Sequence, residues 1–489
     1  MGRTNLRFVL LISSGLILEL VIATGCPLAA QEPAAHVAVN PQERFQIMDG
    51  FGVNFNGTYF RDDQKRMVDM LIDDLGATLF RLDPYGLTNW ETLNDNNDPN
   101  LRNGEYYNDR YSIPAFEASW AAARYLNARG LRPFMTLSGT VPNWMLDDKA
   151  PPPKHHVCKG ESLLRHPLTG GPPHLNPAMY EEFAEEVVSM LVYARTKARI
   201  DFDLFSPFNE TDCYPVEGPR IDPEEAPKVL EVIEQRLRKE GLGDIRLVVA
   251  DQADMANDYA GPILQDAELM KQVAVFSFHS YGNASLTPQV ERVRRSKHPG
   301  IKIWLTEYGD LNDLDRSLDN EWENFSLRAT GRALRAINEG ASAALYWDAY
   351  DNYHEHDARL TFYGLVQNAD HLYSPKKRYY AARQLYHFVR PGAQRIGATS
   401  DSANLLISAF RDAPSNSLIV VGLKQGGPPR VSITLPSSSE APASWDLFMT
   451  TRNLDCQEVD RVAVRKGVAE FDLPDEAIFT LVGTLAKPQ

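Results

Sequence analysis

Eight short apolar segments alternate with longer amphipathic patterns between about residues 50 and 390, and this alternation constrains the fold more than any other feature. The apolar segments are Gly50–Phe55, Thr78–Asp83, Arg132–Ser138, Phe202–Asn209, Arg246–Ala250, Val273–His279, Lys302–Glu307 and Ala343–Trp347. The helix-like patterns between them include Asp62–Leu75, Pro114–Arg129, Pro177–Lys197, Glu224–Lys239 and Glu321–Asn338. Strands that alternate with helices form a parallel sheet with crossover helices. Eight such units predict an α/β protein with a (β/α)8 TIM barrel.

A doubly wound open sheet is the structural alternative. Such a sheet would carry a glycine-rich phosphate loop after its first strand. The first strand here instead continues as Gly52-Val53-Asn54-Phe55-Asn56-Gly57, which is no nucleotide fingerprint. This loop and the count of eight strands favour the barrel.

The pattern changes after about Pro391, where turn clusters separate short runs rich in apolar and β-branched residues. These runs are Leu405–Phe410, Leu418–Leu423, Arg430–Leu435, Ser444–Met449, Val462–Val464 and Ile478–Val482. They predict a C-terminal antiparallel β-sandwich. The strand-like Ala35–Ile47, within segment 31–48, is expected to join it. The predicted domains are therefore a barrel over residues 49–390 and a β-sandwich over residues 391–489.

Residues 1–30 have the features of a bacterial export signal. Arg3 and Arg7 precede the apolar run Phe8–Leu18, and small residues follow. Cleavage after Ala30 would release a soluble protein, whereas Ala23-Thr24-Gly25-Cys26 resembles a lipoprotein box that would make Cys26 a lipid anchor. We favour simple export, to the periplasm, the cell surface or the medium. We expect no membrane span elsewhere in the chain.

The charge of the chain limits its partners. A formal net charge of −15 argues against nucleic acid or an anionic membrane surface as the main partner. The 43% hydrophobic and 24% charged composition is that of a soluble globular protein. A neutral polymer such as a polysaccharide is compatible with both.

Polar residues close five of the predicted strands, at the end where TIM barrels place their active sites. These residues are Arg81 and Asp83, Asn209 and Glu210, His279 and Tyr281, Glu307, and Trp347 and Asp348. The separation of Glu210 and Glu307 corresponds to three βα units of roughly 30 residues each. They are therefore expected to face each other across the barrel mouth. Retaining cleavage of a glycosidic bond requires two such carboxyl groups, about 5–5.5 Å apart.

Several stretches resemble a known enzyme family. Asn209-Glu210 resembles the strand-four acid/base motif of the clan A retaining barrel glycosidases, and Trp304-Leu305-Thr306-Glu307-Tyr308-Gly309 resembles their strand-seven nucleophile motif. Glycoside hydrolase family 30 is the most similar family, with families 5 and 39 as neighbours that share the catalytic pair. The stretches that favour family 30 are Met48–Gly52, Thr136–Met145 and Tyr379–Ile396.

The resemblance implies a role for each matching residue. Glu210 would be the general acid/base, which must start protonated and so needs the higher pKa, and Glu307 would be the nucleophile. Arg81 would keep Glu307 ionised, and Tyr281 or His279 would orient it. Three further substrate-binding residues are expected: Asn209 at the sugar 2-hydroxyl, Trp347 beneath the sugar ring, and Trp144, which is either a sugar-stacking residue or a loop anchor. No cofactor is implied.

Four cysteines and two histidines leave other questions open. Cys158 and Cys213 are a plausible disulfide in an exported protein, and free buried thiols are the alternative. His155 and His156 lie near Cys158, but neighbours in one proline-rich loop give poor tetrahedral geometry, so we expect no metal there. The acidic run Asp310–Asp319 is expected to be solvent-exposed charge.

The sequence favours an exported retaining β-glycoside hydrolase that acts on a β-linked glucan or a related polysaccharide. A non-catalytic carbohydrate-binding barrel and a transglycosylase that uses the same covalent intermediate are the alternatives. The sugar, the linkage and the choice between endo and exo cleavage depend on loops whose shape the sequence does not reveal.

Overall fold

The structure is a computed structural model that describes residues 34–84, 90–147, 149–155, 174–213, 217–354, 359–369, 372–436 and 441–486. The chain divides into two compact units, Met1–Pro33 and Ala34–Gln489. The predicted export signal and Cys26 lie outside the described residues. Within the described ranges, no helix is both long enough and apolar enough to cross a membrane.

Eight parallel strands close into a barrel, as the sequence predicts. In spatial order around the barrel they are β2 (Gly50–Asn56), β3 (Leu79–Asp83), β4 (Phe134–Thr136), β7 (Leu204–Ser206), β8 (Arg246–Gln252), β9 (Val273–Ser280), β10 (Lys302–Tyr308) and β11 (Ala343–Tyr346). Each observed strand overlaps a predicted apolar segment. Apart from Leu79, Leu204, Ala274 and the exposed first residues Arg246 and Lys302, their residues are buried, which explains their near-continuous apolar character.

Side chains fill the barrel interior. Phe134 on β4 and Trp304 on β10 have ring centroids 6.0 Å apart, although their strands lie on opposite sides of the barrel. Val248, Val275 and Leu345 belong to the same buried cluster. The barrel is therefore a packed core that supports the chemistry at its rim.

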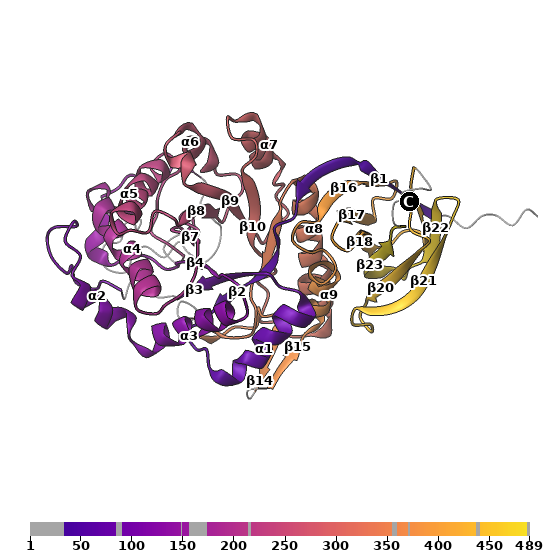
Figure 1. Ribbon diagram of the computed structural model, residues 1–489, viewed down its shortest axis with the longest axis horizontal. Coiled ribbons are helices and arrows are strands. Elements are labelled where there is room, and N and C mark those ends of the chain that lie inside the picture. The colour runs from indigo at the N-terminus through magenta and orange to yellow at the C-terminus, as the bar shows by residue number, and fades with distance from the viewer. Residues whose placement is uncertain are drawn as a thin grey trace, which may run out of the picture. The chain divides into compact units, whose positions relative to one another are not determined.

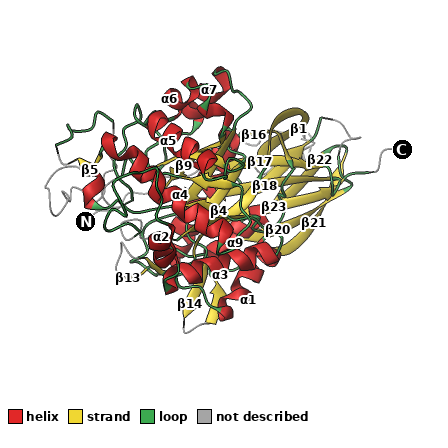
Figure 2. Ribbon diagram, turned by 60° about the vertical axis from the view of Figure 1, so that its left-hand side comes forward, coloured by secondary structure: helices red, strands yellow, loops and turns green. Residues whose placement is uncertain are grey.

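Helices surround the barrel in the described part of the chain (Figures 1 and 2). The α-helices are α1 (Lys65–Met70), α2 (Gly104–Tyr111), α3 (Pro114–Ala128), α4 (Tyr180–Thr196), α5 (Ala226–Lys239), α6 (Ala260–Gln265), α7 (Thr287–Arg295), α8 (Ala329–Glu339) and α9 (Lys377–Tyr386). Shorter or wider turns are η1 (Asp62–Gln64), η2 (Leu71–Leu75), η4 (Asn143–Met145), η5 (Pro177–Met179), η6 (Leu269–Lys271) and η7 (Asn320–Arg328). Asn176 caps η5 by accepting a hydrogen bond from the Ala178 backbone nitrogen at 3.0 Å.

Small two-stranded sheets decorate the loops. They pair β5 (Leu146–Asp147) with β6 (His174–Leu175), β12 (Tyr353–His354) with β13 (Arg359–Leu360), and β14 (Val366–Ala369) with β15 (Leu372–Pro375). Each pairing is antiparallel. The β5–β6 pair holds segments on both sides of the undescribed residues 156–173 against each other.

The C-terminal β-domain is a closed ring of nine strands. In spatial order they are β1 (Ala34–Ile47), β16 (Gln394–Ser400), β17 (Leu405–Asp412), β18 (Ser417–Gln425), β23 (Glu476–Thr484), β20 (Ser444–Thr450), β21 (Gln457–Arg465), β22 (Val468–Asp472) and β19 (Arg430–Thr434). Neighbours pair antiparallel except β1 and β19, which pair parallel and close the ring. The N-terminal strand thus lies in this domain.

The helices α8 and α9 lie between the barrel strands and the β-domain (Figure 1). Gln384 on α9 donates to the Thr450 hydroxyl at 2.9 Å, and the Thr480 hydroxyl donates to the Gln384 carbonyl at 2.5 Å. Trp322 on η7 donates its indole N–H to Glu476 at 2.7 Å. Buried polar contacts of this kind fix the β-domain against the barrel.

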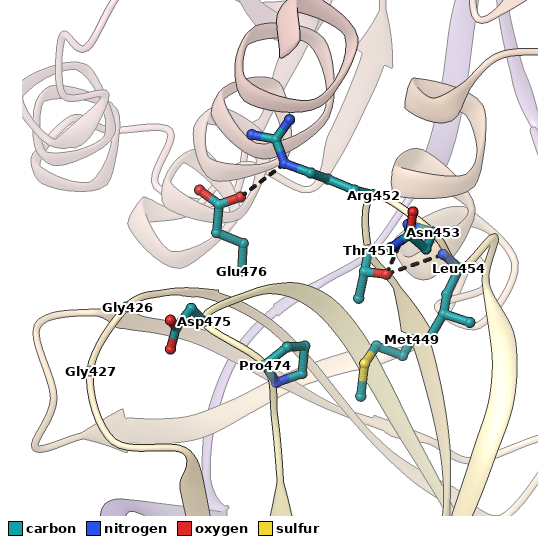
Figure 3. A pocket seen from close by; sticks show the side chains of 10 residues that line it. All are labelled: Gly426, Gly427, Met449, Thr451, Arg452, Asn453, Leu454, Pro474, Asp475 and Glu476. Carbon is teal, nitrogen blue, oxygen red and sulfur yellow. Dashed lines mark hydrogen bonds and ion pairs between the residues drawn. The ribbon is translucent and has the colours of Figure 1, made fainter. Parts of the chain in front are cut away.

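An open pocket of about 980 Å³ lies on the β-domain beside η7. Figure 3 shows Arg452 on its wall directed at Glu476, 3.6 Å away. Arg452 also contacts Glu323 of η7 at 3.0 Å. No residue that lines this pocket is one of the strand-end residues predicted above.

Candidate active site

The predicted strand-end residues converge at one rim of the barrel. Arg81 lies in β3, His279 in β9 and Glu307 in β10, while Asn209 and Glu210 follow β7. All five side chains are buried. Parallel strands of a closed barrel bring their carboxyl ends to the same rim, and this is why residues from distant parts of the sequence are in contact.

Both carboxylate oxygens of Glu307 accept hydrogen bonds. Arg81 donates from Nη1 to Oε1 at 2.6 Å, and the Tyr281 hydroxyl donates to Oε2 at 2.6 Å. Burial raises the pKa of Glu307 to about 7, against the opposing effects of His279, Arg81 and the Tyr281 hydrogen bond. The two donors therefore stabilise the ionised carboxylate against the cost of its burial.

Glu210 has different surroundings. Its Oε1 lies 2.6 Å from Nδ1 of His279. Burial raises the pKa of Glu210 well above its ordinary value, and the nearby carboxyl groups of Glu217 and Asp212 raise it further. Burial also lowers the pKa of His279. These two directions place the shared proton on Glu210, so that Nδ1 of His279 accepts the hydrogen bond.

Glu210 and Glu307 lie opposite each other with His279 between them. One carboxyl oxygen of each glutamate and a ring nitrogen of His279 all lie within 4.8 Å of one another. Nδ1 of His279 is 2.6 Å from Glu210 and 3.4 Å from Oε2 of Glu307. The oxygens thus lie close to the separation of about 5 Å expected from the sequence. The pKa directions also agree with the expected order, in which Glu210 holds its proton more tightly.

Arg81 connects Glu307 to three other side chains. Nη1 also donates to Asn54 at 2.9 Å, and Nη2 donates to Asn209 at 2.7 Å and to Asp251 at 3.0 Å. A guanidinium presents its donors in a rigid planar fork, so these acceptors fix the direction in which Arg81 meets Glu307. The amide nitrogen of Asn209 donates to Glu217 at 3.2 Å.

Asp251 is the chief site residue missing from the sequence prediction. It lies in β8, is fully buried, and accepts a second hydrogen bond from Ser206 at 2.6 Å. Its backbone carbonyl accepts from the Glu210 backbone nitrogen at 2.8 Å. Burial opposes its ionisation, but Arg81, His279 and the donated hydrogen bonds together hold its pKa below the ordinary range. Asp251 therefore supplies the permanent negative charge that balances Arg81.

A sequence signal for Asp251 does exist. It directly follows the apolar run Arg246–Ala250, and so satisfies the strand-end criterion that selected Arg81 and Glu307. The buried Asn54 gives a weaker signal, because it lies inside the first strand rather than at its end.

The site residues include types that bind metals, but their partners favour proton transfer. Glu307 already receives hydrogen bonds from Arg81 and Tyr281, and Glu210 shares its proton with His279. The Arg81 guanidinium supplies the positive charge that a metal would bring. One ionised and one protonated carboxyl group side by side can perform nucleophilic attack and general acid catalysis.

The two tryptophans lie in different settings. Trp347 is half-buried directly after β11, and its backbone nitrogen donates to the Tyr308 carbonyl at 2.9 Å, beside Glu307. Trp144 lies in η4, and its indole N–H donates to the Glu91 carbonyl at 3.0 Å. This hydrogen bond supports the interpretation of Trp144 as a loop anchor.

The structure resolves part of the cysteine question. Cys213 is disulfide-bonded, and its backbone nitrogen donates to the Glu210 carbonyl at 2.6 Å. Cys158, the partner considered from the sequence, lies outside the described residues. Cys456 is a free, buried thiol in the β-domain.

The expectation of a fully solvated acidic run after Glu307 is wrong at two positions. Asp310 is buried and pairs with Arg332 at 3.2 Å, and Asp313 is buried and accepts from the Phe362 backbone nitrogen at 3.2 Å. These carboxylates hold the loop that follows β10 against its neighbours.

Comparisons with known proteins agree with this architecture. No protein-family model matches the chain. A family 30 endoxylanase from Clostridium papyrosolvens C71 aligns over 92% of this chain and 100% of its own, with 20% sequence identity and a TM-score of 0.67. An endo-β-1,6-glucanase aligns over 94% of this chain and 95% of its own, with 17% identity and a TM-score of 0.66.

The fold is that of the family 30 glycoside hydrolases. A family 39 β-xylosidase from Caulobacter crescentus also aligns, over 92% of this chain and 100% of its own, at 14% identity and a lower TM-score of 0.56. The structural likeness therefore agrees with the resemblance of the sequence motifs to family 30 within clan A.

Proposed function

We propose that this chain is an exported retaining β-glycoside hydrolase that cleaves a β-linked polysaccharide by double displacement. The observation that carries the proposal is the pair Glu210 and Glu307, whose carboxyl oxygens lie within 4.8 Å in unlike surroundings. Retaining glycosidases need a short separation because one carboxyl group attacks the sugar directly, whereas inverting enzymes leave room for a water.

In the first step, the ionised Glu307 attacks the anomeric carbon. A bond forms between a Glu307 oxygen and that carbon while the glycosidic carbon–oxygen bond breaks. The bonding electrons move to the leaving oxygen, which takes the proton of Glu210. The product is an ester between the sugar and Glu307, and Glu210 is left as a carboxylate.

In the second step, Glu210 acts as the base. It removes a proton from a water molecule whose oxygen attacks the anomeric carbon, and the bond between the sugar and Glu307 breaks. The free sugar leaves with its original β configuration, because each displacement inverts the carbon once. Glu307 is ionised and Glu210 protonated again. An alcohol in place of water would give transglycosylation through the same intermediate.

The neighbours of the pair support this division of labour. Arg81 and Tyr281 stabilise negative charge on Glu307, which must be ionised to attack. His279 contacts Glu210, and the acids Glu217 and Asp212 raise the pKa of that residue. Two carboxyl groups whose environments push their pKa values apart are the expected arrangement for a nucleophile and an acid.

The substrate we propose is a β-linked glucan or a related polysaccharide such as xylan. The similar structures include enzymes described as xylanases and as an endo-β-1,6-glucanase. The net charge of −15 suits a neutral polymer. Export follows from the proposed signal at residues 1–30, with Ala30 or Cys26 as the processing position.

The test is hydrolysis of a panel of soluble β-glucans, xylans and aryl β-glycosides by the mature chain. Wild type should release reducing sugar from at least one member. Glu307→Gln and Glu210→Gln should lose that activity on polysaccharide, while Glu268→Gln, which changes an exposed glutamate far along the chain, should retain it. Binding of sugar without release of product from any panel member would instead identify a non-catalytic carbohydrate-binding barrel.

A further inference from the structure

A second group of histidine and carboxylate side chains lies on segments that do not contribute to the proposed active site. His174 belongs to β6, and Asp222 and Glu225 lie in the turn that precedes α5. One potential ligand atom of each residue lies within 4.8 Å of the other two. The Leu175 backbone nitrogen donates to the Arg220 carbonyl at 3.0 Å, so backbone pairing holds these segments together.

His155 adds a fourth imidazole or carboxylate donor to this group. Its side chain is 6% exposed, and its Nδ1 lies 3.3 Å from Oδ1 of Asp222. Within the described residues, neither ring nitrogen of His155 forms a hydrogen bond, and Nδ1 of His174 forms none either. Buried polar atoms usually have partners, and an ion is one explanation when protein partners are missing.

Charge at the group leaves room for a cation. Asp222 and Glu225 supply two negative charges, and Arg220 supplies one positive charge by donating to both Asp222 oxygens at 2.6 Å. A carboxylate offers about four lone-pair sites, so the Arg220 fork leaves part of Asp222 available. Arg220 is itself fixed by the Pro151 carbonyl at 2.6 Å, as expected of a partner that orients a metal-binding carboxylate.

We propose that His155, His174, Asp222 and Glu225 bind a divalent transition-metal ion, with zinc as the best-matched ion. Two imidazoles and two carboxylates are donors that zinc accepts, and four donors satisfy its tetrahedral preference. Burial lowers the pKa of His155, which favours the neutral imidazole that binds metal. The geometric objection to a site within the loop at His155 does not apply, because the other donors come from β6 and from the turn before α5.

Bound zinc would connect the segment 149–155, β6 and the start of α5. Since the ion binds only when these segments are folded together, it should stabilise the native state. This inference is independent of the proposed glycosidase activity, because none of the four donors belongs to the Glu210–Glu307 cluster.

The test is a calorimetric titration of the chelator-treated, tag-free mature chain with zinc chloride at pH 7.5. We expect one equivalent of zinc at this site and a higher thermal unfolding midpoint in its presence. Glu225→Gln and His174→Gln should each weaken binding by at least about tenfold and abolish the thermal shift. Glu224→Gln, an exposed neighbour on the same turn, is the matched control and should bind as wild type does.

Two further arms keep the outcome unambiguous. Glu307→Gln removes a ligand of the other metal-compatible group, so zinc uptake that persists in this variant does not arise there. His155→Ala provides a variant in the loop if His174→Gln does not fold. The proposal is overturned if folded wild type takes up no zinc, or if the Glu225 and histidine variants bind zinc as tightly as Glu224→Gln.

Discussion

Replacement of Arg81 by methionine should move the acid limb of the pH–rate profile. Arg81 is 1% exposed and pairs with Glu307 at 2.6 Å and with Asp251 at 3.0 Å. Glu307 must be ionised to attack, and its pKa is about 7 with Arg81 in place. Wild-type kcat/KM should therefore rise with pH through about 7 and fall at higher pH, where Glu210 loses its proton.

The size of the shift follows from the lost charge. Loss of an opposite charge within about 4–6 Å raises a carboxyl pKa by about 1–3 units. At pH 6, below both values, each unit lowers the ionised fraction of Glu307 about tenfold. Arg81→Met should therefore lower kcat/KM at pH 6 by about 10- to 1000-fold. It should also cost about 3–5 kcal/mol of stability, because two buried carboxylates lose their partner.

The assay is kcat/KM on an aryl β-glycoside from pH 4 to 9, together with thermal unfolding. Arg81→Lys, which restores the charge without the fork, should recover part of the lost activity. Arg236→Met is the matched control, because Arg236 is also buried and pairs with Glu185 at 3.1 Å. It should lose stability and keep the wild-type acid limb. An Arg81→Met protein that is folded and shows an unshifted acid limb would refute the assigned role.

Three further predictions concern neighbouring parts of the chain. Tyr281→Phe removes a charge-assisted hydrogen bond worth about 1.5–3 kcal/mol, so kcat should fall by roughly 10- to 150-fold; an unchanged kcat would exclude Tyr281 from support of Glu307. Trp144→Phe leaves the Glu91 carbonyl without its donor and should lower stability by about 1 kcal/mol in urea unfolding, with no loss expected if Trp144 serves only to stack sugar. Burial raises the pKa of Glu91 to about 7 and of Glu185 to about 8; because raised carboxyl pKa values favour the folded state at low pH, stability should fall as pH rises from about 4.5 to 8, and a urea midpoint that increases over this window would contradict the burial of both acids.

The barrel could be predicted because its strands are buried on both faces. Such strands appear as near-continuous apolar runs, and all eight observed strands lie within or overlap the predicted segments. The β-domain was harder to predict in detail. Strands such as Val468–Asp472 alternate polar and apolar residues over a short length, and the parallel pairing of β1 with β19 joins segments that no local pattern connects.

The candidate site was predictable where a polar residue ends an apolar run. Arg81, Glu210 and Glu307 satisfy this criterion, and the structure brings them into one hydrogen-bonded cluster. Asp251 satisfies it too and follows directly after a predicted strand. The partners of each residue, such as His279 for Glu210 and Tyr281 for Glu307, depend on the register between neighbouring strands, which the sequence does not specify. The buried Asp310 also shows that charge alone does not reveal exposure.

The most direct test of the central claim is the configuration of the first product. Time-resolved proton NMR of a hydrolysed β-glycoside distinguishes the α and β anomers before they interconvert. Double displacement through Glu307 predicts that the β anomer is released first and that the α anomer grows in later. Initial release of the α anomer would show inversion, and would contradict the assignment of Glu307 as a nucleophile beside the acid Glu210.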